Sequence, residues 1–507
     1  MDSQHPKRLI EISFPIGDVS KESVREKNIR HGHISTLHIW WARRPLAASR
    51  TTALAALLPD DPQQRTKLLG LIKDLAPWEA AQGENRDLEK ARMLIMKAFG
   101  WRAPRVLDPF AGGGSIPLEA LRLGCEVHAM DYNPVAVLIL KCVLEYPQRY
   151  ASPDSVSVLP LPHNKRSKLR LLSEYDEEER EDESPLLRAV RAWGKWVLKE
   201  ARRELGRFYP PDPDGSIPVG YIWARTLPCQ NPACSAEIPL MRQTWLAKKP
   251  GKKVALRLIP NPTAKRVDAE IVEDSAITFD PSKGTVIKAH VCCPLCGGTM
   301  DDRTTRRLFR EGKAGQRMMA VVLHHPDRPG KRYRLPTERD LEAFHAAEQA
   351  LEEKRRKLWD EWGMDPVPDE PMPPLETLGF RVQRYGLTRW GDLFNSRQKL
   401  ALITFAEKVR QAHAQMLSQG ADPEFAKAVV TYLAITFNRL ADKNASLVVY
   451  NVVGEKVEHV FGRQALPMVW DYVEVNPFTD VGWPNMQEWV ELVLAHLTGI
   501  PPVEEGR

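Results

Sequence analysis

"VLDPFAGGGS", residues 106–115, reads as a buried strand that runs into a glycine-rich turn. A short helix follows and closes at Gly124, and "CEVHAMD" (125–131) predicts a second strand that ends on an acidic residue. The apolar segment "NPVAVLILKCVLEY" (133–146) predicts a second helix. Alternating strands and helices are typical of an α/β domain with a parallel sheet. We therefore expect the strands at 104–108 and 126–130 to be neighbours in such a sheet.

The glycine turn lacks the signature of a phosphate-binding loop, because "SIPLE" stands where Gly-Lys-Ser/Thr would be needed. The dinucleotide pattern G-x-G-x-x-G is met only by Gly112 and Gly114, with Pro117 in the third position. An acid at the tip of the second strand, Asp131, suits ribose hydroxyls, and Asp108 at the tip of the first suits an ammonium group. S-adenosylmethionine combines these two groups. A dinucleotide site and a glycine turn of another α/β domain remain the alternatives.

Composition is that of a soluble globular protein, with 43% hydrophobic and 27% charged residues over 507 positions. This length predicts two to four domains. The sequence has no run of eighteen apolar residues, and its N-terminus is charged where a secretory signal would be apolar. We therefore expect a cytoplasmic location and no membrane partner. Seven cysteines are too few for a disulfide framework in so long a chain.

Four of these cysteines have the spacing of two metal-binding knuckles, "PCQNPAC" and "CPLCGG". Four thiolates on two turns match a tetrahedral structural zinc site, in which the metal replaces a core that a small β module lacks. Cys292 is an alternative to Cys293, although C-x-x-C followed by Gly-Gly is the usual knuckle. The predicted zinc ligands are Cys229, Cys234, Cys293 and Cys296, whereas Cys125 and Cys142 are expected to be buried thiols.

Basic residues concentrate in "RQTWLAKKPGKKVALRLIPNPTAKR" (242–266), which holds eight of them and no acid. A local positive field of this kind suits a polyanion, and we expect Lys248, Lys249, Lys252 and Lys253 to contact the phosphate backbone of a nucleic acid. The alternative is a solvated hairpin of a mildly basic protein, whose net charge is +6.

Together these motifs resemble the prokaryotic adenine-specific DNA methylases that contain a zinc ribbon, within the amino-group DNA methyltransferases. The resemblance rests on "DPFAGGG", on "IRHGHISTLHIWWARRPLAASR" (29–50), on "MDYNPVAVLILK", on "FGRQALPMVWDYVEVNPF" and on the two knuckles. It implies a Rossmann-like sheet with an inserted zinc-ribbon module and a helical region, and N6-adenine methylation of DNA in a restriction or phage-defence system. It places the methionine end of S-adenosylmethionine on the first motif and its ribose on Asp131. The implied cofactor residues are Asp108, Pro109, Phe110, Gly112, Gly114 and Asp131.

The same 29–50 stretch carries further polar residues of open role. Arg43 and Arg44 are interpreted either as surface or ion-paired arginines, or as residues near the cofactor or a DNA phosphate. His31, His33 and His38 lack a nearby acid or cysteine in the sequence, which argues against a metal site.

One expected motif is absent from the sequence. Methylation of an exocyclic amine in this enzyme class uses Asn or Asp followed by Pro-Pro and an aromatic residue that stacks on the flipped base. "VNPF" (475–478) lacks one proline and is at best a degenerate version. We therefore expect the chain to supply cofactor binding and DNA positioning as the first part of a methylase, with the catalytic motif on a second polypeptide. The alternative is a non-catalytic DNA-binding or specificity component with a vestigial cofactor pocket.

These expectations divide the chain into five regions. Residues 1–60 form an N-terminal helical segment, 85–150 the first half of the methyltransferase domain, 151–205 a charged linker and helix, 206–335 the zinc-ribbon insert, and 336–507 a mainly helical region.

Overall fold

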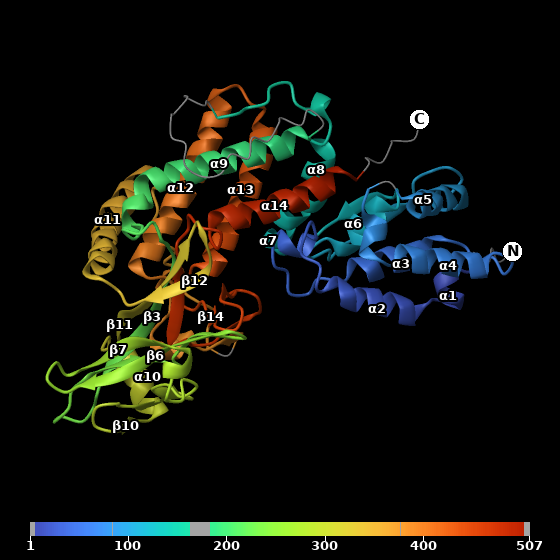
Figure 1. Ribbon diagram of the computed structural model, residues 1–507. Coiled ribbons are helices and arrows are strands. Elements are labelled where there is room, and N and C mark those ends of the chain that lie inside the picture. The colour runs from blue at the N-terminus through green and yellow to red at the C-terminus, as the bar shows by residue number, and fades with distance from the viewer. Residues whose placement is uncertain (1–5, 84, 163–182, 376, 501–507) are drawn as a thin grey trace. The chain divides into compact units, whose positions relative to one another are not determined.

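The computed structural model describes residues 6–83, 85–162, 183–375 and 377–500, and it shows a mixed α/β protein (Figure 1). The chain divides into two compact units. The first takes its residues from 1–194, 412–435 and 487–507, and the second from 195–411 and 436–486. Four long helices contribute residues to both units: α9 (Pro185–Leu205), α12 (Ser396–Ser418), α13 (Pro423–Lys443) and α14 (Trp483–Thr498). Among the described helices, none combines the length and apolar character needed to cross a membrane.

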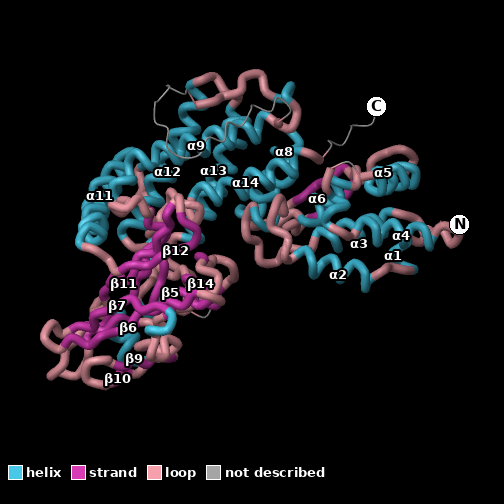
Figure 2. The backbone as a smooth tube through the Cα atoms, in the orientation of Figure 1, coloured by secondary structure: helices cyan, strands magenta, loops and turns pink. Residues whose placement is uncertain are grey.

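Short helices make up most of the first unit (Figure 2). Local sequence sets several of their starts: Asn85 accepts hydrogen bonds from two backbone N–H groups at the start of α5, and Asn133 followed by Pro134 begins α7. The helices are α1 (Leu9–Ile12), α2 (Ile16–Glu26), α3 (Leu46–Leu57), α4 (Arg65–Leu75), α5 (Arg86–Ala98), α6 (Ser115–Arg122), α7 (Pro134–Leu140) and α8 (Tyr146–Arg149).

The expected parallel strand pair is present in the first unit. Strand β1 (Arg105–Asp108) lies parallel to β2 (Glu126–Ala129), with α6 as the crossover between them. Val106 and Val127 pack against the apolar core formed by the surrounding helices. In the described part of the chain these two strands form a sheet of their own, so the β-α-β unit is established but a full methyltransferase sheet is not.

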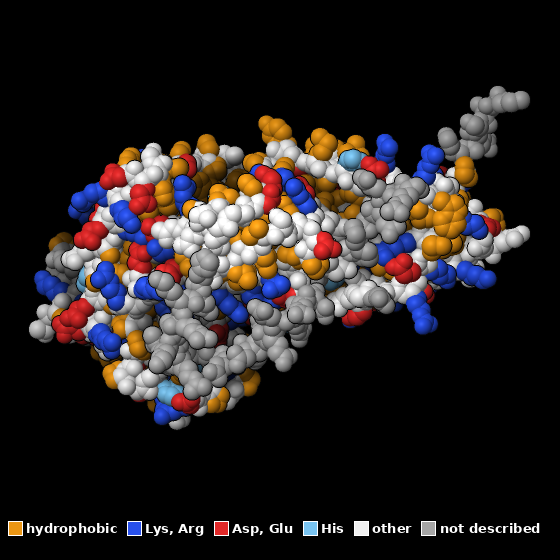
Figure 3. Space-filling model, turned by 90° about the horizontal axis from the view of Figure 1, so that it is seen from above, with side chains coloured by type: hydrophobic (Ala, Val, Ile, Leu, Met, Phe, Trp, Pro, Cys, Tyr) orange, Lys and Arg blue, Asp and Glu red, His pale blue; other side chains and the backbone are white. Residues whose placement is uncertain are grey.

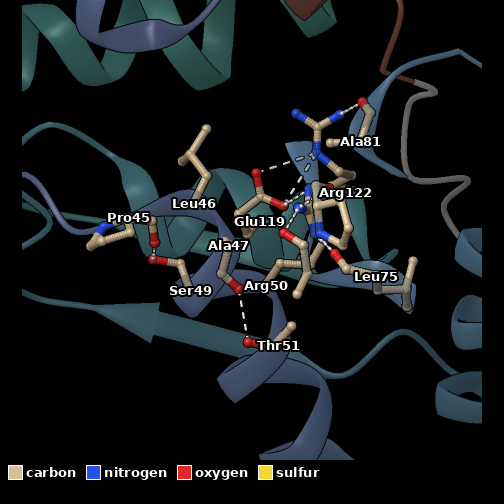
Figure 4. A network of polar contacts seen from close by, with 12 residues as sticks. Pro45, Leu46, Ala47, Ser49, Arg50, Thr51, Leu75, Ala81, Glu119 and Arg122 are labelled. Atoms are coloured by element: carbon tan, nitrogen blue, oxygen red, sulfur yellow. Dashed lines mark hydrogen bonds and ion pairs between the residues drawn. The ribbon is translucent and has the colours of Figure 1, made fainter. Parts of the chain in front are cut away.

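A buried ion network fastens α3 to α6 (Figure 4). The Arg50 guanidinium lies 3.2 Å from one carboxylate oxygen of Glu119, and Arg122 approaches the same oxygen to 3.3 Å. Arg50 Nε also donates to the carbonyl of Leu75 at the end of α4, and Arg122 Nη1 donates to the carbonyl of Ala81. The three charged side chains are almost fully buried, so each one depends on the others to offset the cost of leaving water.

The second unit contains a large mixed sheet with the strand order β12-β11-β3-β4-β7-β6-β5. Its neighbours are antiparallel except for β4 and β7, which pair in parallel. The strands are β3 (Ile217–Pro228), β4 (Glu237–Leu240), β5 (Trp245–Lys249), β6 (Lys252–Asn261), β7 (Arg266–Glu273), β11 (Gly315–His325) and β12 (Arg328–Arg334). All seven of these strands lie within the 206–335 region that was expected to hold the zinc-ribbon insert.

A smaller sheet of β8 (Val286–Ile287), β9 (His290–Cys292) and β10 (Thr299–Met300) carries the second cysteine knuckle and leads into α10 (Asp302–Arg310). The region expected to be mainly helical, 336–507, opens with α11 (Glu338–Trp362). Two further strand pairs complete the unit: β13 (Gly379–Phe380) with β16 (Ala465–Leu466), and β14 (Tyr450–Asn451) with β15 (Lys456–Val457).

Strand β17 (Asp471–Val475), which precedes "VNPF", pairs antiparallel with β3 in the second unit. A degenerate catalytic motif at this place would require β17 to lie parallel to β1 in the first unit. Residues 472–475 of β17 are all buried, and Val473 and Val475 belong to the core of the large sheet. The pairing of β17 with β3 therefore gives no support to "VNPF" as a catalytic motif.

We expect Glu119→Gln to destabilise the first unit by about 3–5 kcal/mol, because it leaves two buried guanidinium groups without their counter-charge. Glu126→Gln is the matched control, since Glu126 pairs with Arg105 at the surface with both side chains about half exposed or more. That pair should contribute at most about 1 kcal/mol. Urea unfolding followed by circular dichroism measures both variants, and equal stability of the two would contradict the role given to the network.

Candidate functional site

The turn between β1 and α6 adopts backbone conformations that favour glycine. Gly112 has φ +53° and Gly114 has φ +80°, both in the left-handed region, and the Gly114 N–H donates to the carbonyl of Ala111 over 2.9 Å. Gly114 is also the residue from which α6 begins. The turn is held on its other side by β2, because the Ala111 N–H donates to the carbonyl of Met130.

The glycines are also required by the packing of the chain against itself. A Cβ atom at Gly112 would lie 2.6 Å from Nε1 of Trp40, and one at Gly113 would lie 3.3 Å from two guanidinium nitrogens of Arg43. A Cβ at Gly114 would lie 3.1 Å from a methyl group of Leu140. The sequence suggested only that a small molecule approaches this turn. In the structure, Trp40 and Arg43 of the "WWARRP" stretch pack directly against the turn.

Arg43 and Ser115 bring polar atoms without partners to this turn. Arg43 Nη2 donates to the carbonyl of His38 over 2.8 Å, whereas Nη1 is buried and has no partner in the described part of the chain. Burial lowers the pKa of Arg43 to about 10, against the opposing effect of Glu26. Ser115 Oγ, at the first position of α6, is likewise buried and unpaired among the described residues. Buried polar atoms of this kind are uncommon and indicate a missing partner.

The acids predicted for the cofactor lie beside the turn. Asp131 is half-buried, and its two carboxylate oxygens accept hydrogen bonds of 2.8 Å from the backbone N–H groups of Gly112 and Asn133. Asp108 accepts a weaker one, of 3.2 Å, from the Phe110 N–H. Each carboxylate retains lone pairs for further donors. The structure thus brings all six predicted cofactor residues together: Asp108, Pro109, Phe110, Gly112, Gly114 and Asp131.

Two exposed aromatic rings flank the acids. Phe110 is 82% exposed and Tyr132 is 97% exposed. Side chains of this size are ordinarily packed, and such exposure marks a binding surface when it is clustered. Tyr132 was not identified from the sequence, although its position next to the strand-terminal acid was a signal.

The three histidines of the 29–50 stretch serve structural roles. The Ser35 N–H donates to His33 Nδ1, so His33 Nε2 carries the proton and donates to Glu26 over 2.8 Å. Glu26 in turn accepts the backbone N–H groups at the start of α3. His38 donates to a neighbouring carbonyl, and His31 stacks on Trp489.

The four predicted cysteine ligands come together in the second unit. Their sulfur atoms all lie within 4.8 Å of one another, with Cys229 Sγ 3.6 Å from Cys296 Sγ and Cys234 Sγ 3.8 Å from Cys293 Sγ. Four sulfurs about 2.3 Å from a tetrahedral zinc ion would be about 3.8 Å apart. Among the described residues this is the one cluster of three or more His, Cys, Asp or Glu ligand atoms that could hold a metal. The structure confirms that the four predicted cysteines lie together, and the identity of the metal stays a prediction.

The environments of the thiols suit a structural metal centre. The Gly298 N–H donates to Cys296 Sγ and lowers the pKa of this exposed thiol to about 7. Burial instead raises the pKa of Cys229 to about 12, so a cation is needed to hold it as a thiolate. Cys292, considered as an alternative ligand, points its sulfur toward the carbonyl of Gly297 and stands outside the cluster.

The basic hairpin formed by β5 and β6 divides its lysines between two environments. Lys249 and Lys252 both form ion pairs with the buried carboxylate of Glu455, and Tyr333 donates to the same carboxylate. Lys248 and Lys253 face each other across the strands and are exposed. Lys249 and Lys252 are therefore held by Glu455, and only Lys248 and Lys253 are available to a polyanion. The prediction that all four lysines contact DNA is corrected to these two.

Residues 13–84 match a family model described as a protein of unknown function, DUF1156. The match covers the segment that contains Trp40, Arg43 and Arg50, and it ends before β1. No curated protein and no solved structure matches the chain.

We expect the purified chain to contain about one zinc ion per molecule, because four thiolates at this spacing bind zinc with about 10 kcal/mol or more. Cys293→Ser should lose the metal and destabilise the knuckles. Cys292→Ser, one residue away and outside the cluster, should keep both metal and stability. Elemental analysis of the two variants measures this, and loss of zinc in the Cys292 variant would overturn the ligand assignment.

A second prediction concerns Glu455. Burial raises the pKa of its carboxylate, but the ion pairs with Lys249 and Lys252 lower it further, so that this pKa is about 2. Because the folded-state pKa is lower than the usual value near 4.5, the stabilisation is complete above pH 4.5 and is lost as the pH falls toward 2. Glu455→Gln should cost about 1–3 kcal/mol at pH 7 and less at pH 3.

The exposed pair formed by Glu270 and Arg257 provides the control, and Glu270→Gln should change stability by less than about 1 kcal/mol at both pH values. If the Glu455 variant showed the same loss at pH 3 as at pH 7, the ion-pair account of the hairpin would be wrong.

Proposed function

We propose that this chain binds S-adenosylmethionine at the β1–α6 turn and acts in the methylation of DNA, with the N6 amine of adenine as the acceptor. The observation that carries the proposal is the combination of two unpaired buried polar atoms, Arg43 Nη1 and Ser115 Oγ, with the strand-terminal acid Asp131 at one glycine turn. S-adenosylmethionine is a nucleoside joined to an amino acid, and it has groups that complement these two polar atoms and this acid.

The residues present fit the cofactor group by group. A carboxylate suits Arg43 Nη1 and Ser115 Oγ, since a buried guanidinium forms its strongest hydrogen bonds with an anion. The ammonium group suits Asp108, and the ribose hydroxyls suit the remaining lone pairs of Asp131. The exposed ring of Tyr132 is available to stack on the adenine base.

When bound, S-adenosylmethionine supplies an electrophilic methyl group on a sulfonium. Transfer forms a C–N bond to the exocyclic amine and breaks the C–S bond, whose electron pair stays on sulfur, and the amine gives up one proton. This chain's residues hold the cofactor in place. Acceptors for the amine hydrogens and a ring to stack on the flipped base must come from the catalytic motif.

Asn476 of "VNPF" does not serve as that acceptor. It is 2% exposed, its Nδ2 donates to the carbonyl of Pro218, and its Oδ1 accepts the N–H of Phe478. Both ends of its amide are thus used to close the turn after β17. Because the 507 residues contain no Asn/Asp-Pro-Pro-aromatic sequence, we propose that a segment outside these residues, on this or another polypeptide, contributes it.

The solvent-facing side of the β1–β2 pair supports such a partner. Leu107 is 62% exposed and Met130 is 59% exposed, next to the exposed rings of Phe110 and Tyr132. Parallel sheets are ordinarily covered on both faces and contain more than two strands. A partner that extends the sheet beside β1 would bury this apolar surface and bring the catalytic motif to the glycine turn.

A non-catalytic DNA-binding component is the second candidate, and one observation favours it. The Trp40 ring lies against Gly112, in the space that an approaching ligand would use. In that case the turn would be a vestigial pocket. Measurable affinity for S-adenosylmethionine separates the two candidates, because the vestigial pocket predicts none.

We expect Asp131→Asn to weaken S-adenosylmethionine binding by about 5- to 150-fold, which corresponds to about 1–3 kcal/mol for losing a charged acceptor of the ribose hydroxyls. The amide can still accept one backbone N–H, so the turn should persist. Glu126→Gln, at the start of β2 and away from the turn, is the control and should bind normally. Titration calorimetry measures the affinities, and unchanged binding by the Asp131 variant would place the cofactor elsewhere.

A further inference from the structure

Helix α10 presents two opposite faces beside the four-cysteine cluster. Its buried face consists of Thr305, Leu308 and Phe309. Leu308 and Phe309 share one apolar core with Cys229 and Cys293, and Thr305 Oγ1 donates to the carbonyl of Ala289 over 3.0 Å. The helix is therefore fixed directly on the knuckles, as its place next to β10 in Figure 1 illustrates.

The opposite face carries a row of arginines. Arg303, Arg307 and Arg310 are exposed and follow the spacing i, i+4, i+7, which places them on one side of the helix. At about 1.5 Å per residue the row is about 10 Å long. This length corresponds to about three nucleotide steps along one DNA strand, at about 3.4 Å per step.

The row is only weakly neutralised by neighbouring acids. Arg307 lies 3.5 Å from Glu311, but both side chains are about half exposed, so water screens the pair. Among the described residues no acid forms an ion pair with Arg303 or Arg310. The nearby Asp301 and Asp302 are used within the helix, where Asp301 caps its start and Asp302 pairs with Arg306.

Arg303 is placed where it does not help the helix. It is the second residue of α10, where a positive charge opposes the helix dipole, and Arg307 follows at the i+4 position, where like charges repel. Both effects are small, and both are unfavourable to the helix. Folding stability alone therefore does not account for this residue.

In the view of Figure 3, Lys and Arg side chains lie interspersed with Asp and Glu side chains. The hairpin lysines that the sequence favoured are half neutralised by Glu455. Arginine is also the better phosphate ligand, because its planar guanidinium binds two oxygens at once.

From these observations we infer that the arginine face of α10 docks on the phosphate backbone of double-stranded DNA. This inference rests on the proposed function, since it names the surface through which the DNA substrate is held. Contacts with phosphate position the duplex without reading its sequence. Because α10 packs on the knuckles, a metal that orders the four cysteines also orders the helix that binds DNA.

The test compares the full chain with the variant Arg303→Ala/Arg307→Ala/Arg310→Ala in binding to a 20-base-pair duplex, by fluorescence anisotropy across a salt series. Loss of up to three phosphate contacts should reduce the slope of log affinity against log salt by about two to three units and the affinity by at least about tenfold at low salt. The matched control removes three exposed cations from α5, in Arg86→Ala/Lys90→Ala/Lys97→Ala, and should leave both quantities nearly unchanged.

A second variant, Arg303→Lys/Arg307→Lys/Arg310→Lys, keeps the charge and should retain most of the salt slope, with circular dichroism reporting whether each variant folds. Equal losses in the α5 control, or a normal salt slope in the alanine variant, would overturn the inference. So would a loss seen on single-stranded RNA of equal length but absent on duplex DNA.

Calorimetry with S-adenosylmethionine separates this inference from the proposed function. All α10 variants should bind the cofactor as the parent chain does. If the chain binds duplex through α10 but has no affinity for the cofactor, the proposed function fails and the docking surface stands. If the chain binds the cofactor while the α10 variants bind duplex normally, the docking surface fails and the proposed function stands.

Discussion

The Arg50–Glu119–Arg122 network is the interaction on which the candidate site depends. Glu119 belongs to α6, the helix that follows the glycine turn, whereas Arg50 belongs to α3, in the segment that contains "WWARRP". Because all three charges are almost fully buried, separating the two helices would leave charged groups unpaired in an apolar interior. The network therefore sets the position from which Trp40 and Arg43 contact the glycine turn.

This arrangement changes how the glycine motif is understood. Glycine at 112 and 114 is needed for backbone conformation, and glycine at 112 and 113 is needed because Trp40 and Arg43 pack so closely. The 13–84 segment that matches DUF1156 thus forms one wall of the candidate site. Its Arg43 contributes a buried nitrogen that still lacks a partner among the described residues.

Local patterns in the sequence were sufficient to predict the β1–α6–β2 unit, the mainly helical character of the region after residue 336 and the four-cysteine cluster. In each case the residues that make the contacts are close in sequence or have a diagnostic spacing. The partners of β17 were not predictable, because a short strand pattern looks the same in sequence whether the strand pairs with β1 or with β3. The same holds for Lys249 and Lys252, whose counter-ion Glu455 lies about 200 residues away in sequence. The Trp40 contact with Gly112 is also long-range, and nothing in the glycine motif itself indicates it.

Binding of S-adenosylmethionine at the β1–α6 turn can be tested by ultraviolet crosslinking of the methyl-labelled cofactor followed by peptide mapping. We expect label in the peptides that contain the exposed rings of Phe110 and Tyr132, and loss of that label when S-adenosylhomocysteine is added in excess. Label that is confined to the second unit, or that persists unchanged with the competitor, would contradict it.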